Sequence, residues 1–329
     1  MVNVKSMEYA IFAQEVIKHY RGRDKNAGLN GFNLAVRPAS IFGLLGPNGA
    51  GKTTAIRILS TLLRPDSGKA TVAGFDVVKQ ARQVRQNIGL VGQYAAVDEI
   101  LTGQQNLVMF GRLNHLSAKH AQQRADELLG QFGLTDAAKI SAAKYSGGMR
   151  RRLDLAASLI VSPAILFVDE PTTGLDPAGR QQVWSVIRSL AASGTTILLT
   201  TQYLEEADQL SDRISILQAG RVIAEGSPDQ LKSTLGGDWI DISLGAGVNP
   251  DSVIEIVRPF ASDDIRIDPQ LNRVSIPVTN HTQSLVKVAG AISLANIELT
   301  DIVLRRPTLD EVFIHLTGSS ETGQLAETK

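Results

Sequence analysis

A glycine-rich octapeptide with a lysine is the part of this sequence best suited to hold a phosphate chain. It reads Gly46-Pro47-Asn48-Gly49-Ala50-Gly51-Lys52-Thr53. Glycine lets successive main-chain N–H groups turn toward one phosphate, and a following helix adds the partial positive charge of its N-terminus. In such a loop Lys52 reaches the β- and γ-phosphates, the Thr53 hydroxyl binds Mg²⁺, and the adjacent Thr54 joins the nucleotide contacts. The octapeptide therefore predicts a loop that binds ATP.

Two acidic residues, Asp169 and Glu170, follow the apolar segment 165–168. An acidic pair at the end of a buried strand is costly unless the charges are used. Asp169 is placed to hold Mg²⁺, directly or through water, and Glu170 is placed to polarise an attacking water as general base. Together with the glycine-rich loop, the pair predicts ATP hydrolysis.

The elements that must position these residues alternate between strand and helix. The glycine-rich loop lies between a strand pattern at 40–45 and a helical pattern at 52–62. Further helical periodicity covers 102–134 and 149–160. The other apolar strand patterns occupy 88–91, 165–168, 196–200 and 214–217. This alternation predicts an α/β domain with a largely parallel buried sheet.

The pattern changes after Gly237, and short strand candidates with one longer helix follow. We therefore expect a first domain at 1–237 and a small α+β domain at 238–317. Thr308 and Glu311 have the spacing of a capping box, which predicts a last short helix. The polar tail 318–329 is expected to be disordered.

Composition excludes several function classes. Lysine plus arginine and aspartate plus glutamate number 33 each, so no global charge favours nucleic acid or anionic lipid. The chain has no cysteine, which excludes disulfides and thiolate chemistry. No apolar run has the length of a signal peptide or of a membrane-spanning helix, so we expect a soluble cytoplasmic chain.

The segment Tyr145-Ser146-Gly147-Gly148-Met149 resembles the signature motif of ABC ATPases, usually written LSGGQ. It lies ahead of a helical pattern and upstream of the acidic pair, as in that family. The resemblance covers roughly residues 7–235 and implies a P-loop ABC-type nucleotide-binding domain with a helical subdomain at about 94–160. Tyr145 and Met149 depart from the family's flanking Leu and Gln.

The resemblance also assigns residues that spacing alone does not. It implies that Gln93 contacts Mg²⁺ and the attacking water, and that Asp176 belongs to the loop that crosses a dimer interface. Tyr20 matches the aromatic residue that stacks on adenine. Gln202 stands where most of the family has a histidine; it can donate a hydrogen bond to the γ-phosphate but cannot carry a proton. The three arginines Arg150–Arg152 are interpreted as a solvated helix face, with an approach of one of them to the nucleotide as the alternative.

In the family, the signature residues of one subunit close on ATP held by the phosphate loop of the other. With one set of motifs, this chain is expected to form a homodimer with Ser146, Gly147 and Gly148 at the nucleotide. The strings 145–154 (YSGGMRRRLD), 200–208 (TTQYLEEAD) and 306–313 (RPTLDEVF) resemble the daunorubicin/doxorubicin-resistance exporter ATPases. That resemblance implies a motor on the cytoplasmic face of the membrane, attached through a separate permease.

Other functions are open at this point. A soluble ABC ATPase that acts on ribosomes or DNA is the main alternative, although two fused ATPase halves or a long coiled-coil insertion are lacking. The balanced charge also disfavours nucleic acid as a partner. A P-loop kinase would leave the Ser146–Gly148 turn unexplained, and an importer motor is disfavoured only by the subfamily resemblance. The C-terminal domain is expected either to support dimerisation or regulation or to stabilise the chain.

Overall fold

The computed structural model describes residues 8–20, 27–92, 96–235, 237–245, 247–279 and 281–324. The chain divides into two compact units, Met1–Ser227 and Pro228–Lys329. The boundary falls earlier than the predicted residue 237, because helix α8 (Pro228–Ser233) packs against α11 (Leu309–Gln324) within the second unit.

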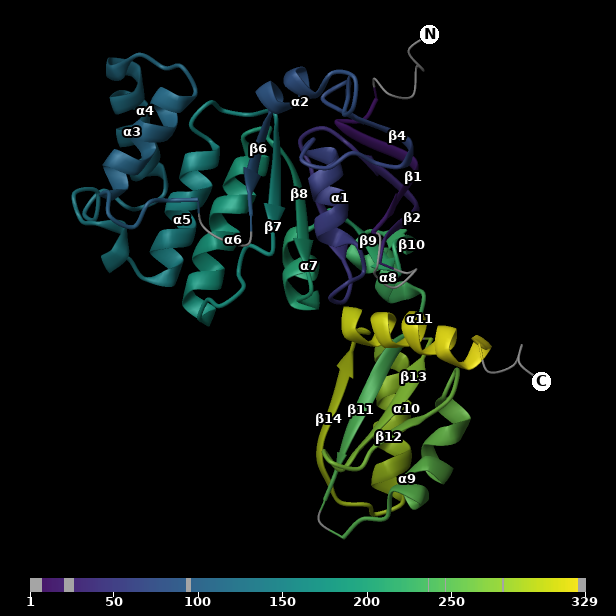
Figure 1. Ribbon diagram of the computed structural model, residues 1–329. Helices are drawn as coiled ribbons and strands as arrows, with labels where there is room; N and C mark the ends of the chain where they lie inside the picture. Colours follow the sequence, from purple (N-terminus) through teal and green to yellow (C-terminus); the bar gives the residue numbers. More distant parts are fainter. Residues whose placement is uncertain are drawn as a thin grey trace. The chain divides into compact units, whose positions relative to one another are not determined.

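The first unit contains two sheets (Figure 1). The smaller sheet is antiparallel, with strand order β2-β1-β4-β5. Its strands are β1 (Ile11–His19), β2 (Gly28–Val36), β4 (Ser67–Val72) and β5 (Phe75–Asp76). The larger sheet has the order β10-β9-β3-β8-β7-β6 and is parallel except for β10. Its strands are β3 (Ile41–Leu45), β6 (Ile88–Val91), β7 (Ile165–Asp169), β8 (Thr196–Thr201), β9 (Arg213–Gln218) and β10 (Arg221–Gly226). The predicted parallel sheet is confirmed.

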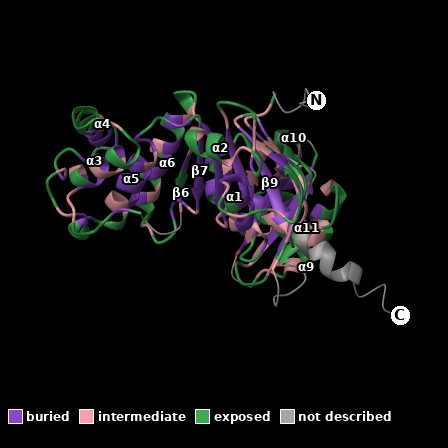
Figure 2. Ribbon diagram, turned by 45° about the horizontal axis from the view of Figure 1, so that its top comes forward, coloured by how far each residue is buried: buried purple, intermediate pink, exposed green. Residues whose placement is uncertain are grey.

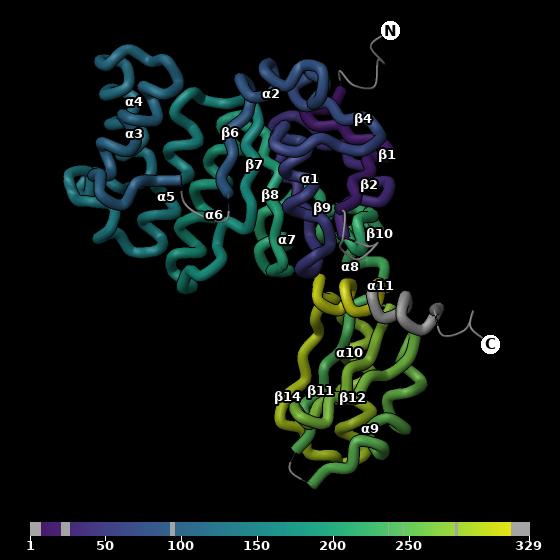
Figure 3. Tube along the Cα trace, in the orientation of Figure 1, coloured from purple at the N-terminus to yellow at the C-terminus, as the bar shows by residue number. Residues whose placement is uncertain are grey.

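The inner strands of the larger sheet, β3, β7, β8 and β9, are buried on both faces, which explains their continuous apolar sequences. Side chains alternate along each strand, so Ile165 and Phe167 enter one core cluster while Leu166 and Val168 enter the other. Figure 2 shows β7, β9 and α1 mostly in the buried colour. The helices of this unit are α1 (Lys52–Leu59), α2 (Ala81–Asn87), α3 (Gly103–Leu113), α4 (Ala118–Gln131), the 3₁₀ helix η2 (Ala142–Lys144), α5 (Gly147–Ser158), α6 (Pro177–Ala192) and α7 (Leu204–Leu210). The trace in Figure 3 shows α1 between the two sheets.

The helical pattern predicted at 102–134 is confirmed and forms two helices, α3 and α4. Thr102 begins α3 with a capping box, in which its side chain accepts a hydrogen bond from the Gln105 N–H. The helix ends before His115, whose φ of 66° is left-handed and incompatible with a continuing helix. Ser117 then caps α4 by accepting a hydrogen bond from the His120 N–H at 3.2 Å. Local capping residues therefore override the long apolar periodicity.

The second unit is a four-stranded antiparallel sheet with helices, as the predicted α+β domain requires. The strand order is β12-β13-β11-β14. Besides α8 and α11, its elements are β11 (Asp238–Leu244), α9 (Pro250–Val257), the 3₁₀ helix η3 (Arg258–Phe260), β12 (Arg266–Asp268), β13 (Arg273–Val278), α10 (His281–Leu294) and β14 (Leu299–Arg305). Ile240 and Ile242 of β11 pack into an apolar core with α9 and α10.

The alternate residues of β11, Trp239 and Asp241, join a network of charges. Arg305 donates to Asp241 at 2.6 Å and makes two hydrogen bonds with Glu311, at 2.9 and 3.0 Å. Arg266 lies 4.5 Å from the centre of the Trp239 ring. The predicted capping box of the last helix is confirmed, since Thr308 and Glu311 exchange hydrogen bonds.

The polar tail predicted at 318–329 is partly helical, because α11 runs to Gln324. Sequence composition predicted disorder there from polarity alone. No proline follows Pro307, so nothing removes a main-chain donor from the continuing helix.

Candidate nucleotide-binding site

The glycine-rich octapeptide forms the connection between β3 and α1, as predicted. Gly49 and Gly51 have φ angles of 82° and 109°, which L side chains rarely adopt. A Cβ on Gly51 would meet the Gly28 carbonyl oxygen at 2.5 Å, so only glycine fits there. No side chain caps the first turn of α1. Its N–H groups therefore face the loop and favour an anion.

Lys52 lies beneath this loop, with only 5% of its surface exposed. Its ammonium donates to the carbonyl oxygens of Gly46 at 2.7 Å and Pro47 at 3.1 Å. Burial lowers the pKa of Lys52, and the carboxylates of Glu170 and Asp169 oppose that effect. The Lys52 Nζ is 3.9 Å from the nearer Glu170 oxygen. The buried Lys52 ammonium thus lies between the glycine-rich loop, which suits a phosphate, and the Glu170 carboxylate.

A hollow of about 260 Å³ opens at this loop. It is lined by Tyr20, Ala27, Gly28, Pro47, Asn48, Gly49, Gly51, Lys52, Thr53, Thr54 and Glu170. The Tyr20 and Thr54 hydroxyls are 3.2 Å apart. The structure therefore brings Tyr20, the loop and Glu170 together from three distant parts of the chain.

The acidic pair lies at the carboxyl end of β7, next to β8 in the sheet. Asp169 is 4% exposed and accepts a hydrogen bond from the hydroxyl of Thr200. Glu170 has a left-handed φ of 48°, and its N–H donates to the Thr200 carbonyl at 3.0 Å. This turn directs Asp169 and Glu170 to different places, with Glu170 at the hollow. Strained dihedrals of this kind cluster at functional sites.

A second hollow, of about 420 Å³, surrounds the signature residues. Ser146 caps α5 by accepting a hydrogen bond from the Met149 N–H at 3.2 Å. Asp176 caps α6 in the same way, with the Gly179 N–H at 2.9 Å. The lining residues are Ser146, Gly147, Gly148, Gly174, Leu175, Asp176, Ala178, Gly179 and Gln182. None of them lines the hollow at the glycine-rich loop.

Tyr145 departs from the family's leucine but takes a buried place. Its hydroxyl donates to the Ala137 carbonyl at 2.8 Å, and burial raises its pKa. The aromatic ring thus packs in the core while its polar end is satisfied.

Gln202 directly follows β8, whose residue Thr200 pairs with Asp169 in the ladder. It is not among the residues that line the hollow at the glycine-rich loop. Gln93, the other glutamine assigned by resemblance, lies outside the described residues.

The interpretation of Arg150–Arg152 as a solvated face is wrong for Arg151, which is only 8% exposed. Its guanidinium bonds the main chain at the ends of β6 and β7. The other two are also engaged: Arg150 pairs with Glu99, and Arg152 donates to the Phe132 carbonyl. A usable signal was present in the sequence, because Leu155 is an apolar residue one helical turn beyond Arg151, which predicts that Arg151 lies on the buried face of the helix.

Sequence reasoning also missed Glu206, a buried carboxyl next to the site. One of its oxygens accepts hydrogen bonds from Thr172 at 2.8 Å and from the Trp184 indole at 3.0 Å. Burial raises the pKa of Glu206, against the hydrogen bonds that it accepts. Glu206 therefore ties the segment after Glu170 to α6 and α7.

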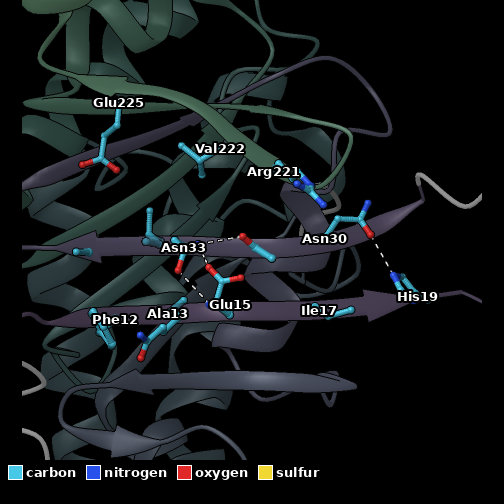
Figure 4. Close-up of a pocket in the computed structure, with 14 residues that line it drawn as sticks. Phe12, Ala13, Glu15, Ile17, His19, Asn30, Asn33, Arg221, Val222 and Glu225 are labelled. Carbon is cyan, nitrogen blue, oxygen red and sulfur yellow. Dashed lines mark hydrogen bonds between the residues drawn. The ribbon is translucent and has the colours of Figure 1, made fainter. Parts of the chain in front are cut away.

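A larger hollow, of about 840 Å³, lies away from these residues, along β1, β2 and β10 (Figure 4). Several of its polar side chains are hydrogen-bonded to one another. The Asn33 amide donates to Glu15 at 2.7 Å and accepts from the Glu15 N–H at 3.0 Å, while His19 and Asn30 are 3.0 Å apart. This hollow is larger than the one at the glycine-rich loop, but none of its lining residues belongs to that loop. We therefore do not assign it as the nucleotide site.

Within the described residues, no helix combines the length and apolar character that crossing a membrane requires. The parallel sheet, the loop between β3 and α1, and the acidic pair after β7 define a P-loop nucleotide-binding protein.

Comparison with known proteins gives a narrower assignment. A profile of ABC transporters matches residues 29–173. The chain is 54% identical over 310 residues to the daunorubicin resistance ATP-binding protein DrrA2 of Streptomyces coeruleorubidus, covering 94% of this chain and 95% of that one. It is 46% identical to the doxorubicin resistance ATP-binding protein DrrA of Mycobacterium tuberculosis, over 95% of each chain. Among solved structures, an ABC transporter component from Clostridium perfringens matches with a TM-score of 0.62 and 26% identity, over 68% of this chain and 90% of that one.

The chain belongs to the ABC transporter family, in the group of daunorubicin/doxorubicin-resistance ATP-binding proteins. It binds ATP and hydrolyses it in connection with transport. The predicted family, subfamily and fold class are thereby confirmed, and the ribosome or DNA alternative is not favoured.

Proposed function

We propose that this ATPase is the motor of an exporter and works as a homodimer with two composite nucleotide sites. One observation carries the proposal. The hollow at the glycine-rich loop and the hollow at the signature residues lie on the same chain but share no lining residue. A second copy, placed head to tail, supplies Ser146, Gly147 and Gly148 to the ATP held by the first copy. ATP then joins the two chains, and its hydrolysis releases them.

At each site, the residues have distinct tasks. The Gly46–Thr53 loop and Lys52 bind the phosphates, and Tyr20 packs on the adenine. Glu170 accepts a proton from the attacking water. Gln202 and the signature N–H groups orient and stabilise the γ-phosphate as charge builds on it.

The donor set also fits Mg²⁺. Among the described residues, no cluster of three or more His, Cys, Asp or Glu side chains could hold a metal on its own. Mg²⁺ at nucleotide sites needs only one or two protein oxygens beside phosphate and water. The Thr53 hydroxyl and the Asp169 carboxylate supply such oxygens, and Gln93 is proposed as a third. The ion would neutralise charge on the phosphates.

We further propose that the cargo is amphipathic, of the daunorubicin kind, because the relatives are named for resistance to such drugs. Cargo contacts would lie in a separate membrane permease, which holds this chain at the cytoplasmic face. The small C-terminal domain, predicted at 238–317 within the second unit, is proposed to support the dimer or its regulation.

The test separates nucleotide binding from closure. Glu170→Gln should bind ATP, lose turnover and elute as a dimer in ATP. Ser146→Arg should bind ATP with unchanged affinity, remain a monomer and be inactive. The reason is that the substitution blocks the signature residues, which one copy supplies to the ATP held by the other, and leaves the glycine-rich loop intact. A Ser146→Arg chain that hydrolyses ATP normally would refute the composite site, and a Glu170→Gln chain that does so would refute the general base. Co-purification from native membranes should recover a multi-span permease.

A further inference from the structure

Arg151 uses all of its donors, four hydrogen bonds going to main-chain carbonyls and one to the Asp154 carboxylate. Nε donates to the Pro171 carbonyl at 2.9 Å. One terminal nitrogen, Nη2, donates to the carbonyls of Asp169 at 3.0 Å and Glu170 at 3.2 Å. The other, Nη1, donates to the Gly92 carbonyl at 2.6 Å and to Asp154 at 3.4 Å. Since a guanidinium has five N–H groups, its hydrogen-bonding capacity is used completely.

Asp154 completes the arrangement on the same face of α5. One carboxylate oxygen accepts from Arg151, and the other accepts from the Ala96 N–H at 2.9 Å. Gly92 and Ala96 flank the segment 93–95, which contains Gln93, in the sequence. Arg151 and Asp154 together therefore bind two parts of the chain. One is the end of β7, which carries the carboxylates, and the other is formed by the two residues on either side of the Gln93 segment.

The helix that carries this pair begins at the signature residues. Ser146 caps α5, and Arg151 lies in its second turn. A helix is stiff over so short a distance, so a displacement of its N-terminus moves Arg151 with it. The carbonyls that Arg151 holds belong to Asp169 and Glu170 themselves, and Glu170 has a left-handed backbone that other contacts must maintain.

We propose that Arg151, oriented by Asp154, is a positioning residue that couples engagement of the signature helix with nucleotide to the placement of Glu170 for hydrolysis. The proposal rests on the proposed roles of Ser146 and Glu170. The partners of Arg151 are four main-chain carbonyls and the Asp154 carboxylate, so its role is to position rather than to react. It acts by fixing the main chain from which Glu170 projects, so that the base is in place only when α5 is seated.

The conservative variant Arg151→Lys provides the test, because lysine keeps the charge beside Asp154 but has three donors for five acceptors. Arg151→Met could fail to fold and is not needed. Asp154→Asn is a second variant, since its one amide oxygen keeps an acceptor for the Ala96 N–H, while the charge and the acceptor that face Arg151 are lost. Arg124→Lys is the matched control: Arg124 also donates to a main-chain carbonyl, that of Leu159 at the other end of α5.

Three quantities are measured on the purified full-length chain: ATP affinity with a fluorescent analogue, kcat, and ATP-dependent dimerisation in a Glu170→Gln background. Arg151→Lys should keep ATP affinity within about threefold and lower kcat by about 10- to 100-fold, the scale expected when a catalytic group is misplaced by about 1 Å. Asp154→Asn should lower kcat less, and Arg124→Lys should leave it unchanged. Dimerisation should persist in each variant.

A merely structural role would change other quantities. It would lower the folded fraction and the melting temperature, and kcat per folded site would stay at the wild-type value; that result would overturn the proposal. Arg151→Lys should also leave the residual rate of Glu170→Gln unaltered, because both changes remove the same step. An equal further loss would overturn the coupling. A normal rate in Glu170→Gln would refute the proposed base, whereas a normal rate in Arg151→Lys with an inactive Glu170→Gln would refute only this inference.

Discussion

The hydrogen bond between Thr200 and Asp169 offers a quantitative test of how the acidic pair is held. Thr200 is fully buried in β8, and its hydroxyl donates to a carboxylate that is 4% exposed. Thr200→Val removes the donor while keeping shape, β-branching and the main-chain ladder. The hydrogen bond from the Glu170 N–H to the Thr200 carbonyl is also retained. The substitution thus isolates one side-chain hydrogen bond.

The expected cost follows from burial and charge. A hydrogen bond to a charged group contributes about 1.5–3 kcal/mol, and the retained carboxylate would lose its partner, so we expect about 2 kcal/mol of destabilisation. For a unit of this size, that should lower Tm by about 4–8 °C. ATP hydrolysis should fall as well, because Asp169 is no longer held in one orientation.

A matched control exists in the same unit. Thr71 in β4 has a buried hydroxyl that finds no hydrogen-bond partner among the described residues. Thr71→Val removes an unsatisfied polar group and adds a methyl, which should leave Tm unchanged or raise it. The chain has two tryptophans, Trp184 and Trp239. In a Trp239→Phe background, thermal unfolding followed by fluorescence therefore reports on the first unit alone. Equal shifts for the two valine variants would refute the reasoning.

Three further variants test other parts of the chain. Lys52→Ala should abolish tight ATP binding, measured with a fluorescent analogue; wild-type affinity would contradict the P-loop assignment. Thr102→Ala should remove the cap of α3 and cost about 1 kcal/mol in thermal unfolding, and an unchanged Tm would mean that the cap is dispensable. Burial acts to raise the pKa of Glu311, but hydrogen bonds from Arg305 and the Thr308 N–H outweigh it and lower that pKa. The stability contributed by ionised Glu311 is therefore present above its ordinary pKa of about 4.3 and is lost as the pH falls further. The difference in Tm between the wild type and Glu311→Gln should thus shrink on acidification from pH 7. A difference that grew would contradict this account.

Much of the site could be predicted because its chemistry is local in the sequence. Gly46–Thr53 is one continuous segment, and its glycines are required by the backbone angles of that same segment. Asp169 and Glu170 follow an apolar run that reads as a buried strand. The capping box at Thr308 depends on residues three apart. Such features are short-range, so residue type and spacing are enough to predict them.

Other features depend on contacts between distant segments. Arg151 belongs to a run of three arginines, which suggested a solvated surface. Four carbonyl oxygens at the ends of β6 and β7 accept hydrogen bonds from it, and no local pattern predicts contacts with residues 18 or more positions away. Glu206 is buried because Thr172 and Trp184 converge on it. The division of 102–134 into two helices, by contrast, depends on local caps at Thr102 and Ser117, which the apolar periodicity did not reveal.

The sequence by itself determined that this chain binds and hydrolyses ATP, because the phosphate loop and the acids are encoded in short continuous segments. Only the tertiary structure decided how the acids are held. Thr200 and Arg151 reach Asp169 and Glu170 across strands and helices that are neighbours in space but not in sequence. The physical reason is that buried polar groups must find partners, and which partners are within reach is decided by packing.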